Sequence, residues 1–173
     1  MAVLSSNIFK IPVLLIITFL VYIGWQNRLE PVYARILVVG ANVALSIVKT
    51  DTSVGVEKEN NTWQFRVQTR IDGRRASFPQ VFGGLLQPFV IILAWQLFLF
   101  LALTRKQALQ SLWVNFGIYY LLQIIFMIFL TGYHTSGVQQ FIYVMFVDSF
   151  YIIALVLILK DNMLYPAFAK SRK

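Results

Sequence analysis

Few side chains in this sequence could carry out catalysis or bind a metal. The 173 residues include one histidine, His134, and no cysteine, which excludes disulfide bonds, thiolate chemistry and the usual zinc sites. The sequence has no His-Glu-x-x-His, no Gly-x-x-x-x-Gly-Lys phosphate loop and no Gly-x-Ser-x-Gly elbow. His134 and Ser136 share one short turn, which is not the arrangement of a base and its nucleophile. We therefore predict no catalytic residue, no metal site and no cofactor.

Asp148 is the ionisable residue with the most unusual position in the sequence. It lies near the middle of the last apolar run, residues 138–159, where an unpaired carboxylate is costly in lipid. One interpretation is a polar pocket, a proton step or a contact with a partner helix, with Gln140 on the same helical face. The other is a hydrogen bond to Asn115 or Gln123 of the neighbouring helix, which would hold the bundle together. These four residues form the predicted intramembrane polar site.

Four arginines form the predicted binding surface. Arg66 and Arg70 lie on the polar face of a predicted strand, and Arg74 and Arg75 follow it. Guanidinium groups suit carboxylates and phosphates, so the target would be an anionic lipid headgroup or an acidic segment of a protein partner. The alternative interpretation is a solvent-exposed strand face with ordinary anchoring at the membrane interface.

The composition indicates that a membrane protein positions these groups. Apolar residues make up 58% of the chain and charged residues 13%, whereas soluble domains have roughly 45–50% and about 25%. Long uncharged runs alternate with short charged stretches, a pattern that is stable in a bilayer. The net charge is +8, but the basic residues flank the apolar runs. Membrane anchoring explains them better than nucleic acid, which we do not expect as a partner.

Four runs are long enough to cross a membrane within a single domain, 1–173. The first run ends at Trp25 without a small-residue cleavage site, which favours an uncleaved helix over a signal peptide. We predict an all-α integral membrane protein with about four transmembrane helices, one interfacial amphipathic helix and a small extracytoplasmic β-hairpin. The expected spans are residues 8–25, 82–104, 109–131 and 138–160, with an extracytoplasmic insert at 26–81.

The insert begins with an amphipathic segment, residues 32–48. Its polar residues recur at helical spacing and so share one face. They are Arg35, Asn42, Ser46 and Lys49. The opposite face is apolar and carries Ile36, Val39, Val43 and Ile47. This pattern predicts a helix that lies in the membrane surface or on the protein; a further membrane span is the alternative.

The rest of the insert shows the pattern of a hairpin. Residues 53–57 and 63–70 have the composition and alternation of strands, and Asn60 with Asn61 favours a tight turn between them. A second turn is expected at Asp72 and Gly73, before the basic pair. The predicted inward face of the second strand consists of Trp63, Phe65, Val67 and Thr69.

The basic residues also predict an orientation. With four spans, the Arg105–Lys106 loop, Lys10 and the basic tail lie on one side, which is expected to be cytoplasmic. The tail residues are Lys170, Arg172 and Lys173. We therefore expect a bacterial inner (cytoplasmic) membrane protein with both termini in the cytoplasm.

The order of these segments over residues 8–104 resembles that of small exosortase H-associated membrane proteins of Gram-negative bacteria. The matching features are a first helix, a basic amphipathic stretch, the hairpin at 55–67 and the helix that opens with Phe82-Gly83-Gly84-Leu85-Leu86-Gln87-Pro88. The resemblance implies an accessory protein of a membrane transpeptidase that sorts proteins with a C-terminal anchor. Such transpeptidases use a membrane-embedded cysteine with arginine and histidine, and this chain has no cysteine, so it is not one of them.

The leading hypothesis is therefore a non-catalytic, multi-pass accessory subunit of a membrane complex. Its expected partners are membrane lipids and another membrane protein. A transporter-like or lipid-binding protein with a polar site around Asp148 is the alternative. A third hypothesis is an enzyme on lipid-linked substrates that uses an arginine and His134.

Overall fold

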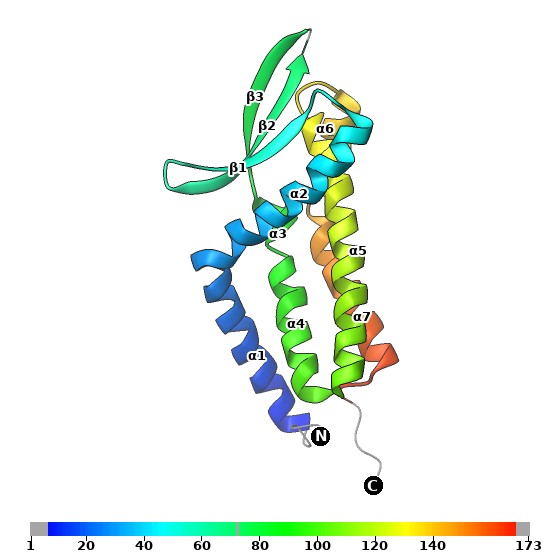
Figure 1. The fold of residues 1–173 in the computed structure, drawn as a ribbon. Helices are drawn as coiled ribbons and strands as arrows, with labels where there is room; N and C mark the ends of the chain where they lie inside the picture. The colour runs from blue at the N-terminus through cyan, green and yellow to red at the C-terminus, as the bar shows by residue number, and fades with distance from the viewer. Residues whose placement is uncertain (1–6, 72, 169–173) are drawn as a thin grey trace.

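A helical bundle carries a three-stranded antiparallel sheet at one end in the computed structural model, which describes residues 7–71 and 73–168 (Figure 1). The helices are α1 (Asn7–Gly24), α2 (Glu30–Val48), α3 (Gly83–Leu86), α4 (Phe89–Ala102), α5 (Arg105–Thr131), α6 (Gly137–Phe146) and α7 (Ser149–Leu164), and a π-helical turn η1 (Trp25–Leu29) joins α1 to α2. The strands are β1 (Ser53–Glu59), β2 (Thr62–Ile71) and β3 (Arg74–Val81).

Helix α2 follows α1 without a break in helical structure, but it runs across the sheet end of the bundle at a steep angle to α1 (Figure 1). The predicted apolar face is exposed, with Val39 at 66% and Ile47 at 81%. A third face, centred on Ala34, Leu37 and Ala41, is fully buried against the bundle. The helix therefore has two apolar faces, one buried against the bundle and one on the outer surface, whereas a surface helix in water usually has only one.

The predicted hairpin is present, but it is part of a larger sheet. Asn60 and Asn61 both have positive φ values, 47° and 66°, as a two-residue turn between strands requires. The predicted inward residues Phe65 and Val67 are fully buried. The expected second turn contains Gly73 at φ 77°; Asp72 lies outside the described residues. It leads into β3, a strand that the sequence analysis did not predict.

Helix α5 begins four residues earlier than predicted, because the chain caps it. The Thr104 backbone N–H and side chain both donate to Gln107 Oε1, in a capping box. The last predicted span is two helices, α6 and α7, which are bent by 47° at a short break. Helix α7 also continues past residue 160 to Leu164. The predicted span 138–160 thus corresponds to a bent pair of helices that ends four residues later, at Leu164.

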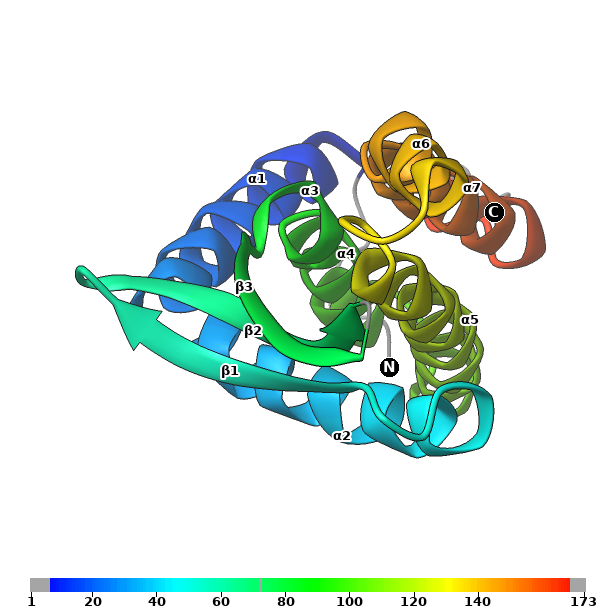
Figure 2. The ribbon, with the colours of Figure 1, turned by 90° about the horizontal axis from the view of Figure 1, so that it is seen from above.

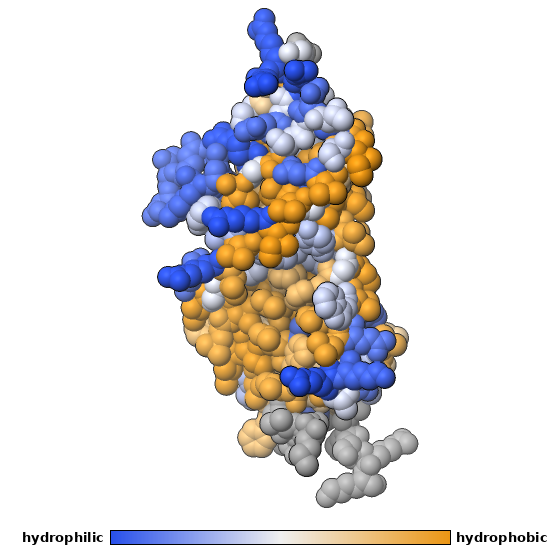
Figure 3. Space-filling view, viewed as in Figure 1, coloured by the Kyte–Doolittle hydropathy of each residue, from blue (hydrophilic) through white to orange (hydrophobic). Residues whose placement is uncertain are grey.

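Three helical segments of the described chain are long and apolar enough to cross a membrane: Phe9–Val48, Gly83–Ala102 and Arg105–Thr131. The bent pair α6–α7 would make up to four if it counts as one span. Apolar side chains cover most of the bundle in the space-filling view, whereas hydrophilic residues gather around the sheet (Figure 3). The generic prediction of membrane helices agrees with this surface.

Seen from above, α4 lies in the middle of the bundle between α1, α5 and α7, and β1 lies over α2 (Figure 2). Helix α1 begins, and α7 ends, at the end of the bundle that is far from the sheet (Figure 1). The connection between α4 and α5, with Arg105 and Lys106, lies at that end too. The start of α1 and the Arg105–Lys106 connection thus lie at the end opposite the sheet, which we call the basic end, although the sheet itself also carries arginines, namely Arg66, Arg70, Arg74 and Arg75.

Candidate functional site

A buried carboxylate lies on the inward face of α7. The buried residues of this helix are Phe150, Ala154, Leu157 and Asp161, at spacings that place them along one face. Asp161 is fully buried. A carboxylate in such a position is tolerated only with hydrogen bonds and a counter-charge, and both are present.

Four side chains surround one oxygen of Asp161. Trp95 Nε1 donates to Oδ2 at 3.0 Å and Gln96 Nε2 at 3.4 Å, both from α4. Ser111 Oγ donates at 2.7 Å and Asn115 Nδ2 at 2.6 Å, both from α5. Because the donors come from two helices and the acceptor from a third, this contact fixes α4, α5 and α7 relative to one another.

The second oxygen of Asp161 has a charge partner. Lys160 Nζ lies 3.2 Å from Oδ1 and also donates to Oδ1 of Asn115. The Lys160 side chain is 30% exposed, so its ammonium group partly reaches the surface while its charge balances the carboxylate. We call Asp161, Lys160 and the four donors the Asp161 cluster.

The residues after α7 close the cluster at the basic end of the bundle. Phe168 stacks on Phe98, with ring centroids 5.5 Å apart, and on Trp95 at 6.3 Å. Buried Lys10 of α1 donates to the Ala167 carbonyl at 2.6 Å. The Asp161 carboxylate is therefore buried and paired within the protein, and its arrangement suits fixing helices rather than moving a proton.

The structure does not bring the four residues of the predicted site around Asp148 together. Asp148 is exposed and lies at the break between α6 and α7, and among the described residues no hydrogen bond joins it to Asn115 or Gln123. Asn115 belongs to the Asp161 cluster, whereas Gln123 donates to the Leu85 carbonyl at 2.6 Å. Gln140 is exposed on α6. The bend between α6 and α7 places Asp148 at a helix end rather than in the middle of one helix.

Sequence reasoning missed Asp161 because it ended the last apolar run before Lys160. Continuing the helical period from Phe150 through Ala154 and Leu157 would have placed Asp161 on the same face. Asn115 was recognised as a polar residue of its helix. Ser111 lies one turn before it on the buried stripe of α5, and neither Ser111 nor Gln96 was predicted.

The sheet separates the four predicted arginines into two pairs. Arg66 forms ion pairs with Glu57 and, at 3.2 Å, with Glu59. The Arg66 guanidinium holds the pKa of Glu57 below its usual value, chiefly by a hydrogen bond. Arg70 pairs with Asp51 at 3.2 Å. These two arginines are already neutralised within the sheet, which reduces their availability to a ligand.

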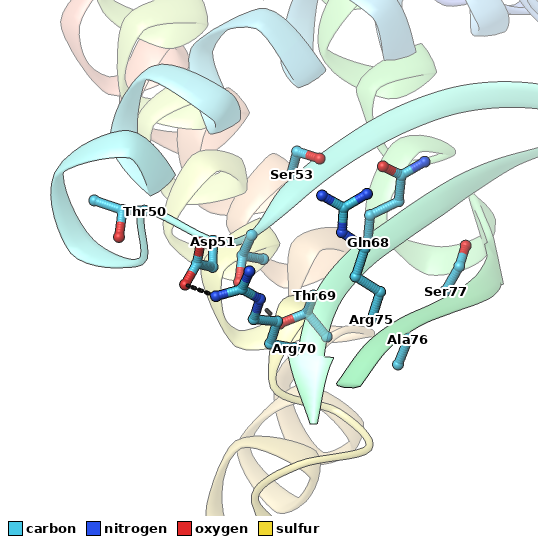
Figure 4. Close-up of a pocket in the computed structure, with 10 residues that line it drawn as sticks. Thr50, Asp51, Ser53, Gln68, Thr69, Arg70, Arg75, Ala76 and Ser77 are labelled. Carbon is cyan, nitrogen blue, oxygen red and sulfur yellow. Dashed lines mark hydrogen bonds and ion pairs between the residues drawn. The ribbon is translucent and has the colours of Figure 1, made fainter. Parts of the chain in front are cut away.

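Arg74 and Arg75 have no ion pair among the described residues, and both are exposed. Arg75 lies directly opposite Arg70 in the β2–β3 register, and like charges in that position destabilise a strand pair. Arg75 lines an open pocket of about 540 Å³ between the start of β1 and the β2–β3 hairpin (Figure 4). The pocket is also lined by Ser53, Gln68, Arg70, Ser77 and neighbouring residues. Hydroxyl, amide and guanidinium groups there suit an anionic group, and the Asp51 carboxylate in the same lining is paired with Arg70.

No family model, curated protein or solved structure matches this chain. The resemblance to exosortase H-associated proteins therefore stays a prediction.

His134 lies where the bundle meets the sheet. Its ring packs edge-on against Phe78 of β3, with centroids 4.4 Å apart, and against Tyr133 at 5.0 Å. No hydrogen bond or ion pair in the described chain joins His134 to Asp148 or to an arginine. The enzyme hypothesis required His134, Asp148 and an arginine to lie within hydrogen-bond reach of one another, and no such contact is found among the described residues.

An apolar groove of about 480 Å³ opens on the side of the bundle between α2, α4 and α5. Its lining consists of Tyr33, Ile36, Phe89, Trp113, Phe116, Gly117 and Tyr120. The two tyrosine hydroxyls are bonded within the protein, to Gln123 and to the Ile36 carbonyl. The groove therefore presents mainly ring and aliphatic carbon to its surroundings.

Proposed function

We propose that this protein is a multi-pass membrane protein and a non-catalytic accessory subunit that binds a partner through its sheet. The apolar surface of the bundle supports insertion in lipid. The basic end would be cytoplasmic by the distribution of Lys and Arg, which places the sheet outside the cytoplasm. More specifically, the sequence resemblance implies that the membrane is a bacterial inner membrane and that the partner is an exosortase-type sorting enzyme.

One contrast carries the proposal. Inside the bundle, the strongly polar side chains bond to one another: the Asp161 cluster is closed, and Gln123 is occupied by Tyr33 and Leu85. On the sheet, Arg74 and Arg75 are exposed without a counter-charge among the described residues. Groups that are ready to bind an external ligand are therefore found on the sheet, whereas the interior groups fulfil structural roles.

Topology can be tested with single cysteines, because the natural chain has none. Ser53→Cys and Ser77→Cys probe the sheet, and Lys106→Cys probes the basic end. A membrane-impermeant maleimide applied to spheroplasts should label the two sheet positions and leave Lys106→Cys unlabelled until the membrane is opened. Labelling of Lys106→Cys in closed spheroplasts, with Ser53→Cys protected, would contradict the orientation.

The accessory role can be tested by native electrophoresis of mildly solubilised membranes from the source organism. The wild-type chain should migrate in a complex of defined composition, and Arg74→Glu with Arg75→Glu should release it. Arg66→Gln is the matched control, because Arg66 is already paired with Glu57, and it should leave the complex intact. A wild-type chain that migrates alone, or a complex indifferent to Arg74 and Arg75, would count against this role.

The apolar groove favours a second candidate function, lipid binding, at a different place from the predicted polar site. A ligand there would be an acyl chain, since the lining is mainly apolar. Gly117 has open space beside it, so Gly117→Leu should fill the groove. If native mass spectrometry shows lipid retained by the wild-type chain and by Gly117→Leu alike, the groove does not hold that lipid.

A further inference from the structure

The two outer edges of the sheet differ in whether another part of the protein binds their outward backbone groups. On the β1 edge, Asn42 of α2 binds the backbone of Val54 with both of its amide atoms. Asn42 Nδ2 donates to the Val54 carbonyl, and the Val54 N–H donates to Asn42 Oδ1, both at 2.8 Å. The side chain thus occupies the outward backbone groups of Val54 that a neighbouring strand would use, so α2 covers this edge at Val54.

The β3 edge has no such cover in the described structure. Ile71 pairs with Arg74 across a two-residue loop, and such a closing pair exchanges both hydrogen bonds. The alternation that follows directs the backbone groups of Arg75 and Ser77 away from β2. Pro79 has the same parity, so its missing N–H lies on the outer side, where proline is tolerated in an edge strand.

The side chains of β3 agree with a free edge. Phe78 points to the bundle and packs on His134, whereas Ser77, Pro79 and Val81 are exposed. Seen from the side, β3 rises away from the bundle to the β2–β3 hairpin (Figure 1). The stretch from Arg75 to Ser77 therefore offers unpaired backbone groups beside an arginine that lacks a counter-charge among the described residues.

We propose that the β3 edge binds an extended, acidic peptide segment of a protein partner by strand addition, an inference that rests on the proposed accessory function. Backbone groups of Arg75 and Ser77 would pair with the added strand, and Pro79 would limit the register to the end near the hairpin. A carboxylate of the peptide would lie on Arg75, in the pocket lined by Ser53, Gln68 and Ser77 (Figure 4). This binding mode combines affinity from the main chain with selection by charge.

The height of the site argues against the headgroups of the surrounding membrane as the ligand. Seven residue steps separate Val81, near the bundle, from Arg74, and a strand rises about 3.3 Å per residue, which gives roughly 23 Å. The β2–β3 hairpin, to which Arg74 and Arg75 belong, projects away from the bundle (Figure 1), at the hydrophilic end of the molecule (Figure 3). This position favours a protein segment over headgroups beside the apolar surface as the ligand.

The test is a titration of the full chain in nanodiscs with a short fluorescent peptide that alternates glutamate and threonine. Ser77→Pro removes the outward N–H together with the side-chain hydroxyl, whereas Ser77→Ala, the matched control, removes the hydroxyl and keeps the N–H. Ser77→Pro should therefore bind about fivefold more weakly than Ser77→Ala, as the loss of one hydrogen bond predicts. Arg75→Gln should weaken binding about tenfold, because a charge-assisted bond is lost, whereas Arg66→Gln should have little effect.

N-methylated peptides provide a readout that does not depend on the folding of a variant. Methylation of alternate residues on one edge of the peptide should abolish binding, and methylation of the other alternate set should not. Equal binding of both methylated peptides, or of a lysine peptide of the same length, would overturn the proposal. So would Arg75-dependent attachment of the nanodiscs to anionic vesicles with no peptide binding. Peptide binding at this edge by a chain that forms no native complex would instead refute only the accessory role.

Discussion

Asn42 and Val54 join the helical bundle to the sheet through two hydrogen bonds of 2.8 Å between one side-chain amide and one residue's backbone. The neighbouring Arg35 lies over the Trp63 ring, 5.5 Å from its centroid. The polar face of α2 thus holds the sheet, and its other faces are apolar. This arrangement explains why an otherwise apolar helix has a row of polar residues.

Replacing Asn42 should loosen the sheet from the bundle. Asn42→Ala leaves both backbone groups of Val54 without this partner, and the expected loss of stability is about 1–3 kcal/mol. Asn42→Asp keeps the acceptor but loses the donor, so its effect should be intermediate. Hydrogen exchange in β1 would measure the change. Ser46→Ala, on the same face and exposed, is the control, and equal exchange in both variants would contradict the anchoring role.

Asp161 should be far more important for stability than Asp148. Asp161→Ala leaves the donors from α4 and α5 and the Lys160 charge without their acceptor, and removal of one partner from a buried ion pair costs about 3–5 kcal/mol. Asp148→Asn changes an exposed side chain and should alter stability by less than about 0.5 kcal/mol. The midpoint of thermal unfolding in detergent compares the two variants. A similar small effect of both would show that the Asp161 cluster does not stabilise the bundle.

Local patterns were sufficient to predict the hairpin and the apolar helices. The alternation in residues 63–70 identified the buried side of β2, and the Asn60-Asn61 pair identified its turn. Strand β3 was missed because Pro79 and the two arginines at its start are unfavourable for a central strand. They are compatible with an edge strand, and which strand is an edge depends on tertiary structure rather than on local sequence.

The polar site could not be predicted for a similar reason. Hydropathy ended the last span before Lys160, and no local rule showed that Asp161 meets donors from α4 and α5. The 47° bend at residues 147–148 likewise moved Asp148 from the expected middle of a helix to a helix end. Pairing between distant helices decides which of two aspartates is buried, and one sequence contains no direct record of that pairing.

Two helical glycines should respond in opposite ways to an added methyl group. A Cβ at Gly40 would lie 2.3 Å from the Tyr120 hydroxyl and 2.8 Å from Ile124, so Gly40→Ala should separate α2 from α5 and cost about 1–3 kcal/mol. A Cβ at Gly117 meets nothing within 4 Å, and Gly117→Ala should stabilise α5 by about 0.5–1 kcal/mol. If the unfolding midpoints of both variants shift in the same direction, the close approach of α2 and α5 at Gly40 is refuted.

The Glu57–Arg66 pair predicts a loss of sheet stability in acid. The pKa of Glu57 is lowered from its ordinary value of 4.5, mainly by the hydrogen bond from Arg66. The pair therefore stabilises the sheet above pH 4.5 and loses this effect as the pH falls through the lower pKa of the folded state. Glu57→Gln should weaken the sheet at neutral pH and reduce its acid sensitivity. Hydrogen exchange in β2 between pH 7 and pH 3 gives the measurement, and an unchanged pH profile would contradict the role of Glu57.

Buried Tyr119 and half-buried Tyr33 should differ in what their hydroxyl groups contribute to stability. The Tyr119 ring packs on Phe150, with centroids 5.4 Å apart, but its buried hydroxyl has no hydrogen-bond partner among the described residues. Tyr119→Phe should therefore keep the packing and remove a costly polar group, so stability should stay the same or rise by about 1 kcal/mol. Tyr33→Phe removes a donor to Gln123 and should lower stability by about 1–3 kcal/mol. If unfolding in detergent shows the opposite order, the Tyr119 hydroxyl has a bonding role that its surroundings in the described chain do not explain.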